Sequence, residues 1–219
     1  MPCAQVTQVA PRSLVWRVVD AGSACPASGG LGSLRRCTVV QAAAGNLRLL
    51  AVGGGRVVTL TGESTVTVDS ADGKTLVSEA LPGQVRAARI DGGVLVALVR
   101  KGSSDVLAEL DARGAIQATF PLPAAKTSGD AVCGDPSGCR LPALRLEDFQ
   151  SGIAVYVLGR DVHLLRLSDK RDVKIRAPGL GPVHAQLEAP GLFYSYRPAA
   201  SPTRGRVAFV PMAALLARF

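Results

Sequence analysis

Five polar side chains stand where a catalytic acid, a base or a metal ligand would be useful. They are Asp91, Glu147, Asp148, His184 and Glu188, and each lies in or beside a short apolar segment. Carboxylates and imidazole exchange protons near neutral pH and bind divalent cations. A cluster of them would therefore suit a metal-dependent hydrolase or lyase.

Local pattern weakens that interpretation. Asp91 and Glu188 fall in turn sequences, where bonds from the side chain to the turn backbone explain their presence. Glu147 and Asp148 are adjacent, so in a regular strand they would point to opposite faces and would not act as a pair. His184 opens a strand-like segment and is the best single candidate, whereas His163 alternates with apolar neighbours as an ordinary strand residue does.

Two familiar catalytic signatures are missing from the sequence. No Gly-x-Ser-x-Gly nucleophile elbow occurs. Gly53–Gly55 is followed neither by Lys-Ser/Thr nor by a helical pattern, so it does not predict a phosphate loop. We therefore predict no catalytic residue, no metal site and no cofactor, and we expect the protein not to be an enzyme.

The five cysteines suggest a different chemistry. Cys25 and Cys37 flank one turn-rich loop, Cys133 and Cys139 flank another, and Cys3 is left over. A disulfide across each loop would reduce the freedom of the unfolded chain, and such bonds persist in oxidising compartments. Zinc fits less well because neither pair has the short spacing of a zinc ribbon.

These pairs predict an extracytoplasmic or secreted protein, although the first residues show no secretory signal. Both facts fit a chain that is the later part of a longer exported protein, or one whose start is misplaced. The alternative is a cytoplasmic protein with free thiols.

Composition limits the partners. The 219 residues are 47% hydrophobic and 19% charged, which excludes an intrinsically disordered chain. No apolar run is long enough to span a bilayer. The net charge of +8 comes mostly from dispersed arginines, and the one aromatic cluster near arginine, Phe193–Arg197, reads as an ordinary packed strand. We therefore expect no specific nucleic-acid binding.

Short alternating apolar runs dominate the sequence and predict β-strands that end at Gly, Pro, Asp or Ser. Four of these runs lead into a glycine-containing turn, marked by Gly54, Gly93, Gly152 and Gly191 at intervals of 39, 59 and 39 residues. The longer interval contains the loop from Ala124 to Pro142. If that loop is treated as an insertion, the spacing of the units is regular, with a period of about 39 residues.

Each complete unit reads as four consecutive strands, which is the pattern of a β-propeller blade. The sequence predicts an all-β fold, a propeller or propeller segment of about four such blades. The expected divisions are 1–43 for N-terminal strands, 44–83 for a blade, 84–143 for a blade with the cysteine-containing insertion, 144–180 for a blade, and 181–219 for an incomplete blade.

Two turns between third and fourth strands carry a family resemblance. Asp69-Ser70-Ala71-Asp72-Gly73-Lys74 and Leu110-Asp111-Ala112-Arg113-Gly114 resemble the corresponding turns of bacterial propellers of the quinoprotein-type and Trp-Asp-like repeat superfamily. The resemblance implies the propeller architecture from about Gly45 to Phe219. It does not imply binding of pyrroloquinoline quinone, because Trp16 is the only tryptophan and the docking pattern is missing.

The incomplete last unit leaves two interpretations open. Arg36–Ala42 would supply the missing outer strand and close the ring, or the chain is an open segment of a larger ring. An open segment would expose apolar faces and self-associate.

We expect a non-enzymatic binding or scaffolding module from an exported bacterial-type protein, with a protein partner held by the loops. The alternative is a metal-dependent hydrolase or lyase with Glu147, Asp148 and His184 facing the central channel.

Overall fold

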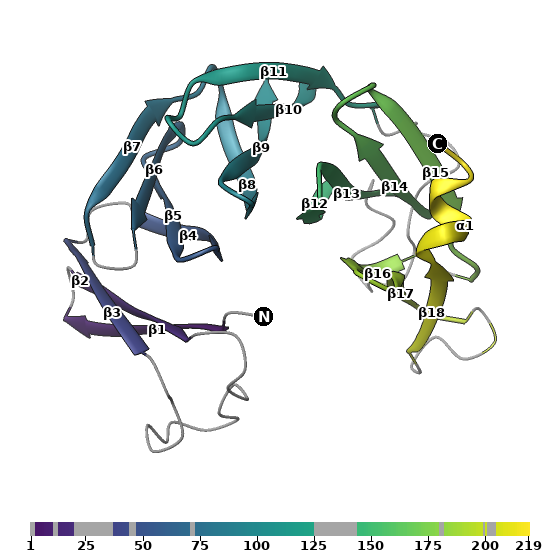
Figure 1. Cartoon of the computed structure of the whole chain (residues 1–219), viewed down its shortest axis with the longest axis horizontal. Helices are drawn as coiled ribbons and strands as arrows, with labels where there is room; N and C mark the ends of the chain where they lie inside the picture. Colours follow the sequence, from purple (N-terminus) through teal and green to yellow (C-terminus); the bar gives the residue numbers. More distant parts are fainter. Residues whose placement is uncertain are drawn as a thin grey trace. The chain divides into compact units, whose positions relative to one another are not determined.

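The computed structural model describes residues 3–10, 13–19, 37–43, 47–70, 73–124, 144–179, 182–198, 200 and 205–219 (Figure 1). In these residues the chain forms five sheets and one short helix. Strands that follow one another in sequence are neighbours in every sheet. This up-and-down order needs only short connections, which suits the turn-rich sequence.

One three-stranded sheet precedes the repeats. It contains β1 (Cys3–Ala10), β2 (Ser13–Val19) and β3 (Cys37–Ala43). The next two sheets have four strands each. They are β4 (Leu47–Gly53), β5 (Arg56–Thr61), β6 (Thr65–Ser70) and β7 (Thr75–Ala80), then β8 (Gln84–Asp91), β9 (Val94–Lys101), β10 (Ser104–Leu110) and β11 (Ile116–Pro121).

The last two sheets contain four and three strands. They are β12 (Arg145–Gln150), β13 (Ile153–Leu158), β14 (Asp161–Arg166) and β15 (Arg171–Arg176), then β16 (Pro182–Glu188), β17 (Gly191–Tyr196) and β18 (Arg206–Pro211). The predicted four-strand unit and its period are therefore confirmed, and the final sheet has three strands among the described residues.

Two details differ from the sequence-based expectation, and one prediction stays open. Cys3–Ala10 was not expected to be a strand, yet it pairs with β2 along most of its length. β3 also pairs with β2, and closure of the last blade by this segment stays a prediction. Met212–Leu216 forms the helix α1, which follows β18 directly in Figure 1. None of the helices in the described part of the chain is long and apolar enough to cross a membrane.

The chain divides into two compact units. The N-terminal unit holds Met1–Gly102 and Ala108–Thr119, and the C-terminal unit holds Ser103–Leu107 and Phe120–Phe219. Within the N-terminal unit, β8 lies against β4 and β5. Within the C-terminal unit, β16 lies against β12, β13 and β14. In each unit, therefore, the first strand of one sheet covers a face of the sheet before it.

Alternation of side chains makes this packing possible. In the C-terminal unit Val155, Val162 and Leu164 lie on one face of their sheet, and all three are fully buried in a core shared with Leu187 and Leu192. Burying each such side chain contributes about 1.5–3 kcal/mol. Leu215 of α1 and Phe219, which follows the helix, also belong to this core. The Arg166 guanidinium lies 4.6 Å from the centre of the Phe219 ring.

Side-chain bonds to the backbone join the first strands of neighbouring sheets. In the N-terminal unit Arg48 donates from Nη2 to the carbonyls of Val85 and Arg86, at 2.9 and 3.2 Å. In the C-terminal unit the Leu187 N–H donates to Asp148 Oδ2 at 2.8 Å. Each of β4, β8, β12 and β16 also contains a β-bulge, which frees backbone groups and re-aims side chains for such contacts.

The turn between β10 and β11 depends on a glycine. Gly114 has φ +81°, and a Cβ built there would collide with Cγ1 of Val77 on β7. Replacement of Gly114 by alanine should cost about 1–2 kcal/mol for the left-handed backbone and about 1–3 kcal/mol for the collision. Chemical denaturation of the full chain measures the loss.

Gly102→Ala is the matched control. Its φ is +60°, but a Cβ there meets nothing within 4 Å. This variant should lose only the backbone contribution, and equal losses for the two variants would contradict the packing of Gly114 on Val77.

Candidate functional site

The structure brings two of the predicted site residues together. The Nδ1 atom of His184 on β16 lies 3.3 Å from Oε2 of Glu147 on β12. Glu147 also accepts a 2.7 Å bond from Nε of Arg145. The Glu147 side chain is 10% exposed and that of His184 is 78% exposed. The pair thus consists of an exposed imidazole and a mostly buried carboxylate that contacts its Nδ1 atom.

Asp148 has a different role from its neighbour. Its Oδ1 accepts the Phe149 N–H, and its Oδ2 accepts the Leu187 N–H. The expectation that strand alternation separates Glu147 from Asp148 was wrong, because the β12 bulge lies between Leu146 and Asp148 and both carboxylates contact β16. Asp148 is fully engaged in joining two sheets, so His184 and Glu147 remain as the pair with chemical freedom.

The other predicted residues lie apart from this pair. Asp91 ends β8, in the turn position that the sequence indicated. Glu188 ends β16 and accepts a 2.7 Å bond from Nε2 of Gln186. Cys25, Cys133 and Cys139 lie outside the described residues, as does nearly all of the Ala124–Pro142 loop, and Cys37 is described only as backbone at the start of β3. The disulfides therefore stay a prediction.

Among the described residues, no three His, Cys, Asp or Glu side chains lie close enough together to hold a metal ion. Orientation toward a central channel also stays a prediction for His184, Glu147 and Asp148.

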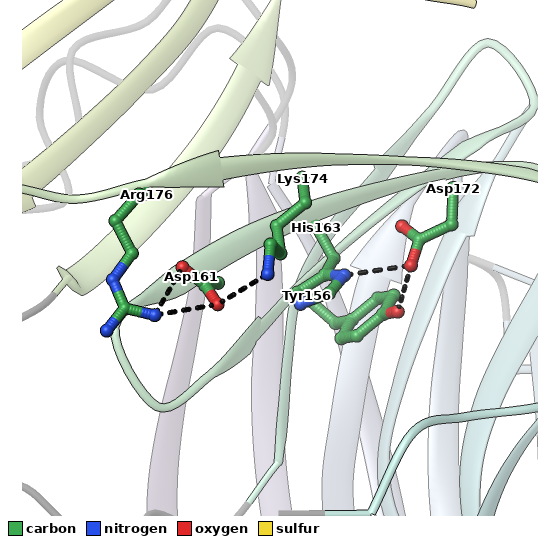
Figure 2. Close-up of polar contacts among 6 residues, drawn as sticks. All are labelled: Tyr156, Asp161, His163, Asp172, Lys174 and Arg176. Carbon is green, nitrogen blue, oxygen red and sulfur yellow. Dashed lines mark hydrogen bonds and ion pairs between the residues drawn. The ribbon is translucent and has the colours of Figure 1, made fainter. Parts of the chain in front are cut away.

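A buried polar cluster on the β12–β15 sheet was not predicted. Tyr156 on β13 lies directly opposite His163 on β14, and their rings stack with centroids 4.6 Å apart. Asp172 on β15 accepts two 2.8 Å bonds at the same oxygen, from the Tyr156 hydroxyl and from Nδ1 of His163. Figure 2 shows this carboxylate between its two donors. Because an ionised carboxylate only accepts, Nδ1 of His163 is the donor in this contact.

A second carboxylate on the same sheet has two cationic partners. Asp161 on β14 is 3.2 Å from Nη1 of Arg176 and 3.4 Å from Nζ of Lys174, both on β15 (Figure 2). The two clusters together link three consecutive strands by side chains on one face.

Two members of the Tyr156 cluster are buried, since Tyr156 and His163 are 2% and 6% exposed, whereas the Asp172 side chain is 33% exposed. Burial raises the pKa of the Tyr156 hydroxyl, and the negative charge of Asp172 raises it further, so this group stays protonated and donates to Asp172. Because the rings of Tyr156 and His163 are buried and both donate to Asp172, the cluster is suited to fixing strand register.

An open apolar face lies on the last sheet. Phe193, Val207 and Phe209 are 36%, 72% and 46% exposed, and the two phenyl rings lie 4.7 Å apart. We call Phe193, Ser195, Val207 and Phe209 the Phe193 face; in the strand register they form two directly opposed pairs. The sequence had indicated a packed strand here, and packing holds only for the opposite side, where Leu192 and Tyr194 are buried.

Comparison of the strand pairing in the last two sheets shows why the Phe193 face is unusual. The hairpins β12–β13 and β16–β17 close at Gln150–Ile153 and Glu188–Gly191. Counting from these closures, Phe193, Val207 and Phe209 occupy the positions of Val155, Val162 and Leu164. In the preceding sheet those positions are fully buried beneath the next sheet. The last sheet thus keeps apolar residues at the positions where sheets pack, but leaves them exposed.

A shallow groove borders the Phe193 face. It has a volume of about 170 Å³ and is lined by His184, Ala185, Gln186, Phe193, Tyr194, Ser195 and Val207. His184 therefore connects the polar pair with Glu147 to the apolar face.

The chain is similar to solved structures of known fold. BamB from Moraxella catarrhalis matches with a TM-score of 0.50 and 14% identity, over 94% of this chain and 64% of BamB. BamB is a β-propeller. The fold is that of a β-propeller segment.

Two further propellers match at lower scores. Kluyveromyces lactis Hsv2 has a TM-score of 0.49 and 10% identity, over 76% of this chain and 45% of Hsv2. HIRA residues 644–1017 have a TM-score of 0.46 and 16% identity, over 81% of this chain and 54% of that one. This chain thus spans less than two thirds of the length of each of these three propellers. No family model matches the sequence, and no curated protein matches it.

The Tyr156 cluster predicts a measurable loss of stability. Asp172→Ala leaves the Tyr156 hydroxyl and the His163 Nδ1–H without their acceptor, which should cost about 2–3 kcal/mol in the free energy of unfolding. Urea denaturation at neutral pH measures this cost.

Asp169→Ala is the control because Asp169 pairs with Arg166 at the exposed end of the same sheet. Exposed ion pairs contribute little to stability. If Asp172→Ala unfolds at the same urea concentration as Asp169→Ala, the buried cluster does not stabilise the sheet.

Proposed function

We propose that this chain is a non-enzymatic binding module of the β-propeller type, and that it binds a protein partner through the Phe193 face. The observation that carries the proposal is the exposure of Phe193, Val207 and Phe209 at positions whose equivalents pack against a neighbouring sheet. Contiguous exposed apolar residues with a polar border are typical of protein interaction surfaces.

The chemistry of the face favours a protein over a small molecule. Two adjacent, tilted phenyl rings offer a broad apolar anchor, and aromatic anchors dominate the energy of protein interfaces. The adjoining groove is shallow and its volume of about 170 Å³ is below the range typical of small-molecule pockets. Ser195 and the exposed His184 supply the polar border.

We further propose that the module belongs among the bacterial propellers of the quinoprotein-type and Trp-Asp-like repeat superfamily, and that it works outside the cytoplasm. The turns support the first point: Gly73 and Gly114 donate their N–H groups to the Ser70 and Asp111 carbonyls, each at 2.9 Å. The paired spacing of Cys25 with Cys37 and of Cys133 with Cys139 supports the second.

A photo-crosslinking amino acid at position 207 tests the proposed face in extracts of the source cells. We expect it to capture one protein of defined mass. The purified captured protein should then bind the wild-type chain, and the double variant Phe193→Ser, Phe209→Ser should bind it at least tenfold more weakly. Loss of two phenyl groups that the proposed complex would bury justifies this magnitude.

Leu76 provides the matched control position, because it is also apolar and exposed but lies on β7 of the first four-stranded sheet. Identical products from positions 76 and 207 would contradict the proposal. Crosslinks only to a second copy of the chain would show that the face mediates self-association instead.

Export and disulfide formation predict a specific thiol count. With both proposed pairs oxidised, titration of the unfolded, unreduced protein from its native compartment should find one free thiol out of the five cysteines, contributed by Cys3. A count of five would overturn the extracytoplasmic assignment.

A further inference from the structure

In the described part of the chain, the outer edge of β18 is unpaired. It stands at the end of the β16-β17-β18 sheet, whereas each third strand of the four-stranded sheets, β6, β10 and β14, is covered by a fourth strand. Among the described residues, no strand pairs with β18 on the side away from β17. α1 does not shield Val207 or Phe209, because its buried Leu215 packs into the core and both residues stay well exposed.

Hydrogen-bonded and non-hydrogen-bonded residue pairs alternate between β17 and β18. This alternation shows which backbone atoms point to the outer edge of β18. The Met212 N–H donates to the Pro190 carbonyl at 2.9 Å, so the opposed residues Gly191 and Pro211 form a non-hydrogen-bonded pair. Pairs then alternate along the strands. Tyr194–Ala208 is hydrogen-bonded, whereas Phe193–Phe209 and Ser195–Val207 are not. The N–H and C=O groups of Val207 and Phe209 therefore point away from β17, toward the free edge.

This edge lacks the protection that another edge strand of the chain carries. β15 ends its sheet with the exposed cations Arg171, Lys174 and Arg176, which discourage pairing with a further strand. β18 has four consecutive uncharged residues, Val207–Val210, between Arg206 and Pro211. An uncharged strand with free backbone donors and acceptors is a template for another strand.

Charge indicates the kind of strand that fits. Residues 182–219 contain one acidic residue, Glu188, and four arginines: Arg197, Arg204, Arg206 and Arg218. Arg206 is exposed at the start of β18. An incoming segment with acidic residues beside its apolar positions would therefore be attracted to this edge.

We propose that the partner of this module binds by strand addition: an extended, acidic segment of the partner pairs antiparallel with β18 through the backbone of Val207 and Phe209. The antiparallel direction follows from β6–β7 and β14–β15 in the same chain. This inference rests on the proposed function, since it specifies how the protein partner of the Phe193 face is held.

A single substitution separates the backbone contact from the side-chain contact. Val207→Pro removes the outward N–H of residue 207 without breaking a bond to β17, and proline is tolerated on a strand edge that faces solvent. Val207→Ala removes side-chain atoms but keeps the N–H. Both variants should show unchanged thermal unfolding, which is measured first.

The probe is a fluorescent peptide of residues 73–82, which contains the β7 strand, with Lys74 replaced by Glu to make it acidic. Anisotropy should show binding to the full chain. We expect Val207→Pro to weaken binding at least tenfold and Val207→Ala less than threefold. The unmodified peptide should bind more weakly than the acidic one, and added salt should reduce that difference.

Amide hydrogen exchange gives an independent readout. In the free protein the amides of Val207 and Phe209 should exchange faster than that of Ala208, and the acidic peptide should protect them. No binding at about 1 mM peptide, or equal binding by Val207→Pro and wild type, would overturn strand addition. The crosslinking result at position 207 and the weaker binding of the Phe193, Phe209 double variant would still stand, so the two proposals fail separately.

Discussion

A sheet in this protein is stable only when another sheet covers its apolar face. Strands of six to eight residues cannot bury enough surface by pairing alone, because a single sheet leaves both faces in water. β16 and β17 provide Leu187 and Leu192, which share one core with the β12–β15 sheet. In that core Val155, Val162 and Leu164 are fully buried. Repetition of this contact explains why consecutive sheets follow one another at a fixed period, and why the last face differs from the rest.

Polar groups determine how strands and sheets are aligned, because apolar packing alone is not directional. Asp148 accepts a backbone N–H from the next sheet, and Asp172 holds Tyr156 and His163 in register across three strands. In both cases a carboxylate satisfies donors that would otherwise be buried without a partner. Slippage by one residue would lose these bonds and turn the apolar side chains to the wrong face.

Sequence pattern predicted the elements better than the contacts between them. Alternation and the glycine turns indicated the repeated strands correctly, since both are local properties. The β12 bulge was missed because Glu147 and Asp148 look like any two neighbours in a strand. Tyr156 and Asp172 are sixteen residues apart, and only the register of two hairpins brings them together. The exposure of Phe193 was missed because alternation reveals which residues share a face, but not whether that face is covered.

The contacts between first strands also bear on how such repeats can be rearranged. At one junction the cation Arg48 reaches forward to two carbonyl oxygens, and at another the anion Asp148 reaches forward to an N–H. A repeated sheet moved from one junction to the other would place a cation beside an N–H donor, or an anion beside carbonyl oxygens. Although the repeated sheets share a strand order, they are not interchangeable parts. Shuffling or duplicating them would therefore require the first strand to change together with the neighbour that receives it.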